Sequence, residues 1–469
     1  MRNYLGQAIG LTGLVMAFLL ILSAVSKETT IAGINIRRMD ILSDIRNTTI
    51  TAAPDSLEVA AMDSLTTSLP IDTTLMAKED IPIGQVDSTL FGQVIEDYSF
   101  EQNGLVRFFS AVDSIQTHRQ KVRVAFFGDS FIEGDIFLGD LRDTLQSLWG
   151  GAGVGFVPMT SEVARFRRTF IQKYEGWKTY SIVHNDGNNT PFGIDGHVYI
   201  PGAEAFTHLE GTSQYACRNT AAWSDVKLFY KADQGARFIW QLKGTGPIEA
   251  ALPTTTGRLS VWEHREDQRT ITAFATRFPH PEGLNVYGAS LESGPGIYID
   301  NFSVRGNSGG KLCLINSNML QAFQQYQGYD MIILQFGLNA VTNSLRNITW
   351  YRAELEKTFA HVRNSFPGVP VLVLSVPDRG GKVDGELTTM ISVPYIVQMQ
   401  RDLARKHGFM FYDFYRGMGG YGSMVRLSEA RHPTLVNKDY THLTHEGGRL
   451  MGLQFGALME KARQHYELR

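Results

Sequence analysis

Two hydrophobic patterns follow one another along this chain, and their order is the strongest constraint on its fold. Residues 122–130 (VRVAFFGDS) have the apolar run of a buried strand that ends in a turn, and residues 137–149 have the period of an amphipathic helix. Similar strand and helix patterns return after residue 330. Strands that alternate with helices predict a parallel sheet, because parallel neighbours need a long crossover connection. We therefore expect an α/β domain.

The second half of the chain continues this α/β pattern. Each expected strand is a short apolar run, and each expected helix shows a 3.6-residue period. Gly408 follows one of these helices and is a suitable stop signal. Strands are expected at residues 330–337, 369–377 and 409–414, and helices at 350–366, 393–408 and 446–466.

Between residues 165 and 300 the pattern changes to short alternating segments separated by turn residues. Examples are DVKLFYKA (225–232) and ARFIWQLKG (236–244). Alternation with a period of two and no amphipathic helix predicts a β-sandwich or jelly roll. We expect this domain to be inserted into the α/β domain, whose two parts would then be residues 94–164 and 301–469.

The N-terminal region predicts export. Residues 8–25 form an uncharged apolar run, which is short for a membrane-spanning helix and long for the core of a signal peptide. Residues 1–26 are therefore either a signal peptide or a membrane anchor. Residues 27–93 are rich in Ser, Thr, Asp and Ala and are expected to form a disordered linker. Both alternatives place the rest of the chain in the periplasm or cell envelope, attached to the inner membrane if the helix is retained.

Composition excludes several other functions. The formal net charge of −3 provides no basic field for binding nucleic acid. The two cysteines, Cys217 and Cys313, form no CxxC motif, so no structural zinc site is expected. We expect two free, buried thiols, with a disulfide between them as the alternative. The sequence implies neither a metal nor an organic cofactor.

Candidate catalytic residues lie where strands are expected to end. Ser130 follows a buried strand, and open α/β sheets bind ligands at the carboxyl ends of their strands. A serine nucleophile needs a base oriented by an acid, and the Asp439-x-x-His442 spacing can supply that pair. The alternative is that Asp439 caps the last helix and His442 lies on the surface. Gly309 and Asn339 could donate hydrogen bonds to an oxyanion, although each residue taken singly is better explained as a loop Gly or a turn Asn.

Taken in order, these residues resemble the blocks of the SGNH (GDSL) hydrolase family. The resemblance implies a flavodoxin-like, three-layer α/β fold with Ser130 as nucleophile, His442 as base and Asp439 as orienting acid. It further implies an oxyanion hole formed by Ser130, Gly309 and Asn339. The matching blocks are GDS at 128–130, SG at 308–309, GxN at 337–339 and DxxHLTxxG at 439–447.

Other segments resemble bacterial peptidoglycan O-acetylesterases that contain an inserted carbohydrate-binding-module-like domain. These segments are residues 128–137, 150–159 and 287–310. The resemblance implies a serine esterase that removes O-acetyl groups from cell-wall glycan, with the 6-O-acetyl group of muramic acid as the favoured target. Alternatives are an esterase for another acetylated polysaccharide or lipid, a glycan O-acyltransferase, and a binding module with a vestigial site.

The sequence departs from these families at two positions. Ala340 stands where many SGNH hydrolases have Asp, and Phe131 stands where many of these esterases have His. Several nearby polar residues are expected to be structural. Asp129 and Asp135 are expected to cap the following helix, and His445 to be a solvated helix-start residue. Trp240 and Trp262 are expected in the core of the insert, with stacking on sugars as the alternative.

Overall fold

The computed structural model describes residues 29–31, 34–36, 94–184, 190–212 and 218–467. The expected N-terminal apolar helix and most of the expected linker lie outside these ranges. Contacts divide the chain into two units, Met1–Asp72 and Thr73–Arg469. The first unit contains the antiparallel pair β1 (Thr29–Ile31) and β2 (Ile34–Ile36). Among the described residues, no helix has both the length and the apolar character needed to cross a membrane.

The second unit contains the expected α/β sheet, and its strands are parallel except at one edge. Its central strands are almost wholly buried, which explains why they are continuous apolar runs in the sequence. The short edge strand pairs antiparallel with its neighbour. In spatial order the strands are β14 (Gly296–Ser303), β4 (Lys121–Gly128), β15 (Met331–Gln335), β16 (Val371–Leu374), β19 (Met410–Tyr412) and β3 (Glu96–Asp97).

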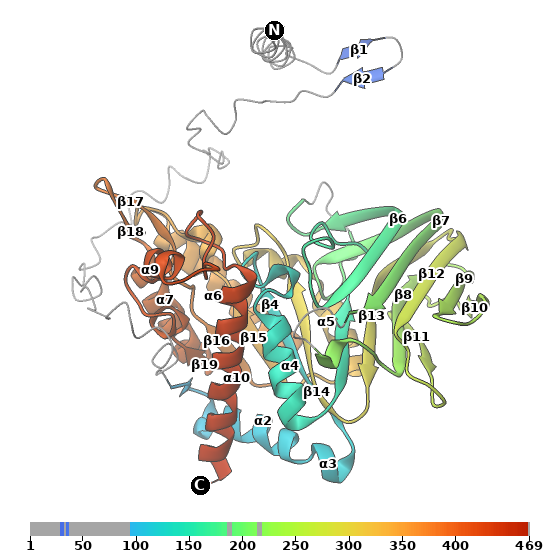
Figure 1. Ribbon diagram of the computed structural model, residues 1–469, viewed down its shortest axis with the longest axis horizontal. Coiled ribbons are helices and arrows are strands. Elements are labelled where there is room, and N and C mark those ends of the chain that lie inside the picture. The colour runs from blue at the N-terminus through green and yellow to red at the C-terminus, as the bar shows by residue number, and fades with distance from the viewer. Residues whose placement is uncertain (1–28, 32–33, 37–93, 185–189, 213–217, 468–469) are drawn as a thin grey trace, which may run out of the picture. The chain divides into compact units, whose positions relative to one another are not determined.

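Helices form two packed groups beside this sheet. In Figure 1, α4 and α10 run side by side, and α2 also contacts α10. In the second group, α6 packs against both α5 and α7. The predicted glycine stop is confirmed, because Gly408 follows α7 with a positive φ, and Gly150 ends α4 in the same way. The helices are α2 (Gly104–Asp113), α4 (Leu138–Trp149), α5 (Ser317–Gln327), α6 (Ile348–Ser365), α7 (Val393–His407) and α10 (His445–Glu467).

Shorter elements complete the α/β part. The hairpin β17 (Gly380–Val383) and β18 (Glu386–Thr389) lies between β16 and α7 in the chain, and the 3₁₀ helices are single short turns. The remaining elements are α3 (Ile115–His118), α8 (Phe414–Gly417), α9 (Ser423–Glu429), η3 (Phe100–Gln102), η4 (Glu133–Asp135), η5 (Arg218–Thr220), η6 (Gly310–Leu314) and η7 (Leu338–Ala340).

The insert is all-β, as predicted, but it forms one continuous antiparallel sheet of nine strands rather than the two sheets of a sandwich or jelly roll. The pairing of strand β13 accounts for the difference. It pairs with three neighbours, and its register with one of them shifts next to Gly288, whose φ is +129°. The strands are β5 (Ala152–Val157), β6 (Phe170–Ser181), β7 (His197–Gly211), β8 (Asp225–Ala232), β9 (Ala236–Leu242), β10 (Ile248–Leu252), β11 (Ser260–Arg265), β12 (Ala273–His280) and β13 (Leu284–Ser293).

The chain passes from one sheet to the other close to, but not at, the expected domain boundaries. Strand β5 precedes residue 165 yet pairs with β13 of the insert. Strand β14 begins before residue 300 yet pairs in parallel with β4 over its whole length. The polar residues Asp300 and Asn301 interrupt the apolar sequence of β14, so only the position of its neighbour reveals the sheet to which it belongs.

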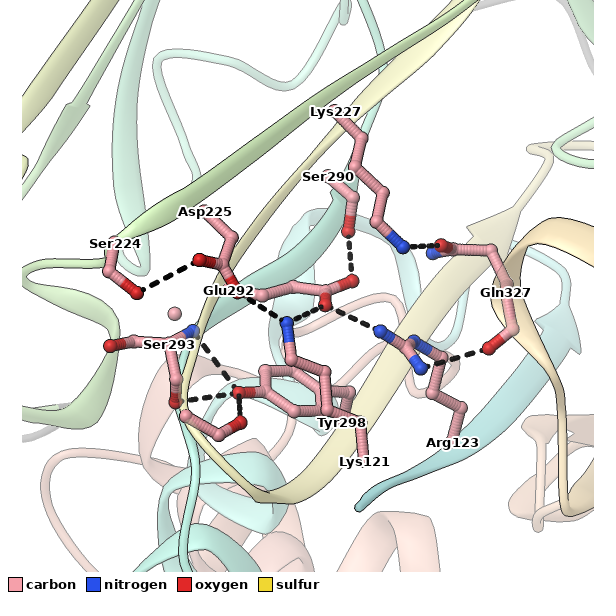
Figure 2. Close-up of polar contacts among 12 residues, drawn as sticks. Lys121, Arg123, Ser224, Asp225, Lys227, Ser290, Glu292, Ser293, Tyr298 and Gln327 are labelled. Carbon is pink, nitrogen blue, oxygen red and sulfur yellow. Dashed lines mark hydrogen bonds and ion pairs between the residues drawn. The ribbon is translucent and has the colours of Figure 1, made fainter. Parts of the chain in front are cut away.

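A buried ionic network joins the insert to the amino end of β4 (Figure 2). The Glu292 carboxylate of β13 accepts hydrogen bonds from Lys121 at 2.8 Å, Arg123 at 2.5 Å and Ser290 at 2.6 Å. Lys121 also binds Asp225 of β8 at 2.6 Å. Since β4 contributes both cations, this network attaches two strands of the insert to the central parallel sheet.

Two core predictions have different outcomes. Trp240 is only 7% exposed and its ring lies 5.2 Å from that of Trp262, so core packing is confirmed for Trp240, while Trp262 is partly buried against the same cluster. Cys313 is a free thiol, as expected, but it is exposed rather than buried. Its position in η6, on the outer turn before α5, leaves it open to solvent. Cys217 lies outside the described residues.

Candidate active site

Ser130 lies just beyond the carboxyl end of β4, between two parallel neighbours. In the strand register, Gly128 is opposite Ser303 of β14 and Gln335 of β15. A side chain at Gly128 would meet Ile132 and the carbonyl oxygen of Gln335, at 2.7 and 3.0 Å from its Cβ. Glycine therefore permits the tight turn that presents Ser130 at this edge of the sheet.

A chain of hydrogen bonds joins Ser130 to His442 and Asp439. Ser130 Oγ lies 2.9 Å from His442 Nε2, and His442 Nδ1 lies 2.7 Å from Asp439 Oδ2. A carboxylate can only accept, so we assign the proton of the histidine to Nδ1, which leaves Nε2 to accept from the serine hydroxyl. The three residues thus have the geometry of a nucleophile, a base and an orienting acid.

Local backbone geometry holds Asp439 against the histidine. Its Oδ1 accepts from the backbone N–H groups of Thr441 at 3.0 Å and His442 at 3.1 Å. Tyr440, between Asp439 and Thr441, has a φ of +50°. Partial burial alone would raise the pKa of Asp439, but the hydrogen bonds from His442 and Thr441 outweigh burial and lower it. Asp439 therefore remains a carboxylate that can stabilise an imidazolium.

Gly309 and Asn339 are both bound to Asn307. The Gly309 N–H donates to Asn307 Oδ1 at 2.9 Å, and Asn339 Nδ2 donates to Asn307 O at 3.2 Å. Gly309 has a φ of +114°, and a Cβ there would lie 3.3 Å from the Phe336 ring. In the described part of the chain, no hydrogen bond joins Ser130 to either residue. The buried Asn307 was not singled out from the sequence, although its position two residues before Gly309 is typical of an Asx turn.

Asp129 does not cap a helix, contrary to the expectation from sequence. It is fully buried next to Ser130, and its Oδ1 accepts from the Phe131 N–H at 2.9 Å. Burial raises the pKa of Asp129 to about 7, although the N–H groups of Phe131 and Leu338 and the Arg379 charge act in the opposite direction. Leu338 begins η7, which contains Asn339. The Asp129 carboxyl therefore holds η7 next to the turn that contains Ser130.

Asp135 and His445 also differ from expectation. Asp135 has a φ of +60° and lies inside an ionic cluster with Arg142, while its side chain also accepts from Thr169 at 2.6 Å and Asn301 at 2.8 Å. Asp135 therefore links the loop that follows Ser130 to the start of the insert and does not cap α4. His445 begins α10, as expected, but its ring packs 4.6 Å from that of Phe166 and is only partly solvated.

A cavity of about 210 Å³ opens over Ser130 and His442. Val163 and Phe166 form part of its wall, and they come from the segment that connects β5 to β6 of the insert. Connecting segments of both the α/β part and the insert therefore surround Ser130. The other lining residues are Glu133, Ile136, Arg305 and Asn437.

Comparison with known proteins shows the fold of an esterase. No protein-family model matches the chain, and no curated protein sequence matches it. A solved structure described as a peptidoglycan O-acetylesterase in action superimposes with a TM-score of 0.62 at 20% identity, covering 79% of this chain and 99% of that one. The chain therefore has the fold of a peptidoglycan O-acetylesterase, in agreement with the resemblance noted in its sequence.

Two further superpositions are much looser and support no argument. An active-site mutant of a family 2 carbohydrate esterase from Clostridium thermocellum gives a TM-score of 0.24 at 9% identity, covering 62% of this chain and 98% of that chain. A family 29 carbohydrate-binding module from Piromyces equi gives 0.20 at 10% identity, covering 31% of this chain and 91% of that chain.

Proposed function

We propose that this protein is an SGNH-type serine esterase that removes O-acetyl groups from cell-wall glycan, with peptidoglycan as the favoured substrate. The observation that carries the proposal is the hydrogen-bonded series Ser130–His442–Asp439 at the carboxyl end of a parallel sheet. The fold shared with a peptidoglycan O-acetylesterase supports the same reaction class. The apolar segment at residues 8–25 supports the further proposal that the enzyme acts in the cell envelope.

In the proposed reaction, Ser130 Oγ attacks the acetyl carbonyl carbon while His442 Nε2 takes the hydroxyl proton. Asp439 stabilises the resulting imidazolium. Collapse of the tetrahedral intermediate breaks the ester bond, and His442 gives its proton to the leaving sugar oxygen. Water, deprotonated by the same histidine, then attacks the acetyl-serine. The bond between Ser130 Oγ and the acyl carbon breaks, His442 returns the proton to Ser130 Oγ, and acetic acid leaves as acetate.

The oxyanion is proposed to be held by the N–H groups of Ser130 and Gly309 and by Asn339 Nδ2. Asn339 Nδ2 has two hydrogens, so its bond to Asn307 O leaves one free for the oxyanion. The single hydrogen of Gly309 N–H is bonded to Asn307 Oδ1, so this donor must share its hydrogen or exchange partners as negative charge develops.

Ser130→Ala tests this proposal directly. The variant should lose acetate release from 4-nitrophenyl acetate and from O-acetylated peptidoglycan, because no other hydroxyl is bonded to His442 among the described residues. A matched control is Ser147→Ala, which changes an exposed serine of α4. Wild-type activity in Ser130→Ala would refute the assignment. Acetylated xylan as substrate, and transferred acetyl measured beside released acetate, would reveal a different glycan or an acyltransferase.

A further inference from the structure

A second cavity, of about 390 Å³, adjoins the one over Ser130. The two cavities share Glu133, Val163 and Arg305 as lining residues, so a ligand could extend from one into the other. A volume of this size falls within the range of small-molecule binding sites. The mechanism above uses none of the side chains that line only this second cavity.

The insert provides one wall of this cavity. Trp177, Thr179 and Ser181 alternate along β6 and therefore share one face, and Tyr199 and His197 of β7 pair with Thr179 and Ser181. The indole N–H of Trp177 is bonded to a backbone oxygen of β7 at 2.9 Å, which fixes the ring. This wall offers an aromatic ring and hydroxyl groups, as saccharide sites do.

Arg167 on the facing segment is a cation without a full set of partners. Its Nε is enclosed and has no hydrogen-bond partner among the described residues. Its other two nitrogens make only long bonds, to Gln172 at 3.3 Å and to Ser161 at 3.4 Å. The guanidinium lies 4.6 Å from the centre of the Phe170 ring, which holds its plane in place.

Nearby carboxylates leave this guanidinium without a direct ion pair among the described residues. The charges of Arg142 and Arg167 both act on Asp135, but among the described residues Asp135 forms an ion pair only with Arg142. Glu133 is already paired with Arg305 at 2.5 Å, and Asp195 accepts from Tyr199 at 2.6 Å. A guanidinium with an unsatisfied Nε and no ion-pair partner among the described residues favours an anionic ligand.

We propose that this second cavity binds the carboxylate of an acidic glycan through Arg167, beside the glycan's acetylated position at Ser130. The proposal rests on the function proposed above and deepens it by adding a charge requirement to the substrate. The carboxylate could belong to the sugar, as in the lactyl group of muramic acid, or to an attached stem peptide. Both sources present the same planar anion to the guanidinium.

Steady-state kinetics with three matched probes tests this charge requirement on the full-length protein. The probes are 6-O-acetyl-N-acetylmuramic acid, its uncharged lactyl amide, and a 6-O-acetylated muramyl dipeptide with a free terminal carboxylate. The wild type should show a KM roughly tenfold lower for at least one charged probe than for the amide. Preference for the acid identifies the sugar carboxylate, and preference for the dipeptide alone identifies the peptide carboxylate.

Arg167→Gln should abolish this preference, and Arg167→Lys should restore part of it because charge returns without the planar fork. Arg165→Gln is the control, since Arg165 is exposed two residues away. Equal KM values for all three probes in the wild type would overturn the proposal, as would a preference that survives in a folded Arg167→Gln variant.

Calorimetry on the Ser130→Ala protein provides a test that requires neither turnover nor a folded Arg167 variant. N-acetylmuramic acid or N-acetylmuramyl dipeptide should bind at least tenfold more tightly than the lactyl amide. Equal binding of all three would refute the carboxylate site. If the wild type lacked esterase activity while charged probes still bound selectively, the proposed function would fail and the site would stand.

Discussion

Replacing Glu292 by Gln should destabilise the protein strongly, because Glu292 neutralises two cations at the junction between the sheets. Its side chain is 1% exposed and accepts from both Lys121 and Arg123 (Figure 2). Burial alone would raise the pKa of Glu292, but Arg123, Lys121 and Lys227 outweigh burial and hold that pKa far below its usual range. The carboxylate is therefore charged in the folded state at all ordinary pH values.

The expected loss is about 3–5 kcal/mol, since breaking a buried ion pair leaves its partner charges uncompensated. Asp225 also pairs with Lys121 at 2.6 Å, so part of the charge remains balanced and the lower end of that range is expected. Glu249→Gln is the control, because its pair with Arg237 is more than half exposed and should be worth less than about 1 kcal/mol.

Urea unfolding followed by tryptophan fluorescence would measure both variants from pH 3 to pH 8. A carboxyl with a depressed folded pKa stabilises above its unfolded pKa of about 4.3 and loses that stabilisation as the pH falls. The difference between wild type and Glu292→Gln should therefore be constant above about pH 5 and shrink below about pH 4. Equal losses in Glu292→Gln and Glu249→Gln at pH 7 would refute the reasoning.

Two further changes test residues beside the nucleophile. Asn339→Ala should lower kcat on 4-nitrophenyl acetate by about 10²–10³-fold, because one proposed oxyanion donor is lost, and an unchanged kcat would exclude that role. The free energy of unfolding of Asp129→Asn should rise by about 2–3 kcal/mol relative to that of the wild type between pH 5 and pH 8. The raised pKa of about 7 makes ionisation of Asp129 costly in the folded state, so the wild type loses stability as the pH rises. Urea unfolding at the two pH values measures this gain, and a difference that does not change with pH would argue against a raised pKa.

The α/β strands were predictable because strands that are buried along their whole length consist of continuous apolar residues. Strands β4, β15 and β16 are buried along nearly their whole length, so each is a short apolar run followed by a turn. Strand β14 is equally buried but includes Asp300, whose carboxyl accepts from the Phe156 N–H and from Tyr329. The polar partners of this residue come from other parts of the chain, so the interrupted apolar run gave no indication of a buried parallel strand.

The candidate site was predictable only where the chemistry is local or the resemblance is specific. The Asp439-x-x-His442 spacing places acid and base together within one turn. The contact of His442 with Ser130 spans 312 positions, and family resemblance rather than any local rule indicated it. Arg167 carries no such signal, because its exposure to a cavity results from the packing of the insert against the nucleophile loop.

The insert meets the α/β part at both ends of β4, and this bears on how the proposed site is built. Glu292 binds Lys121 at the amino end, while the segment containing Val163 and Arg167 reaches the cavities at the carboxyl end. Two attachments separated by the length of a strand oppose hinge motion more effectively than one. The proposed bond cleavage therefore depends on the edge of the parallel sheet, whereas the proposed selection of a charged glycan depends on the insert being held in a fixed position over that edge.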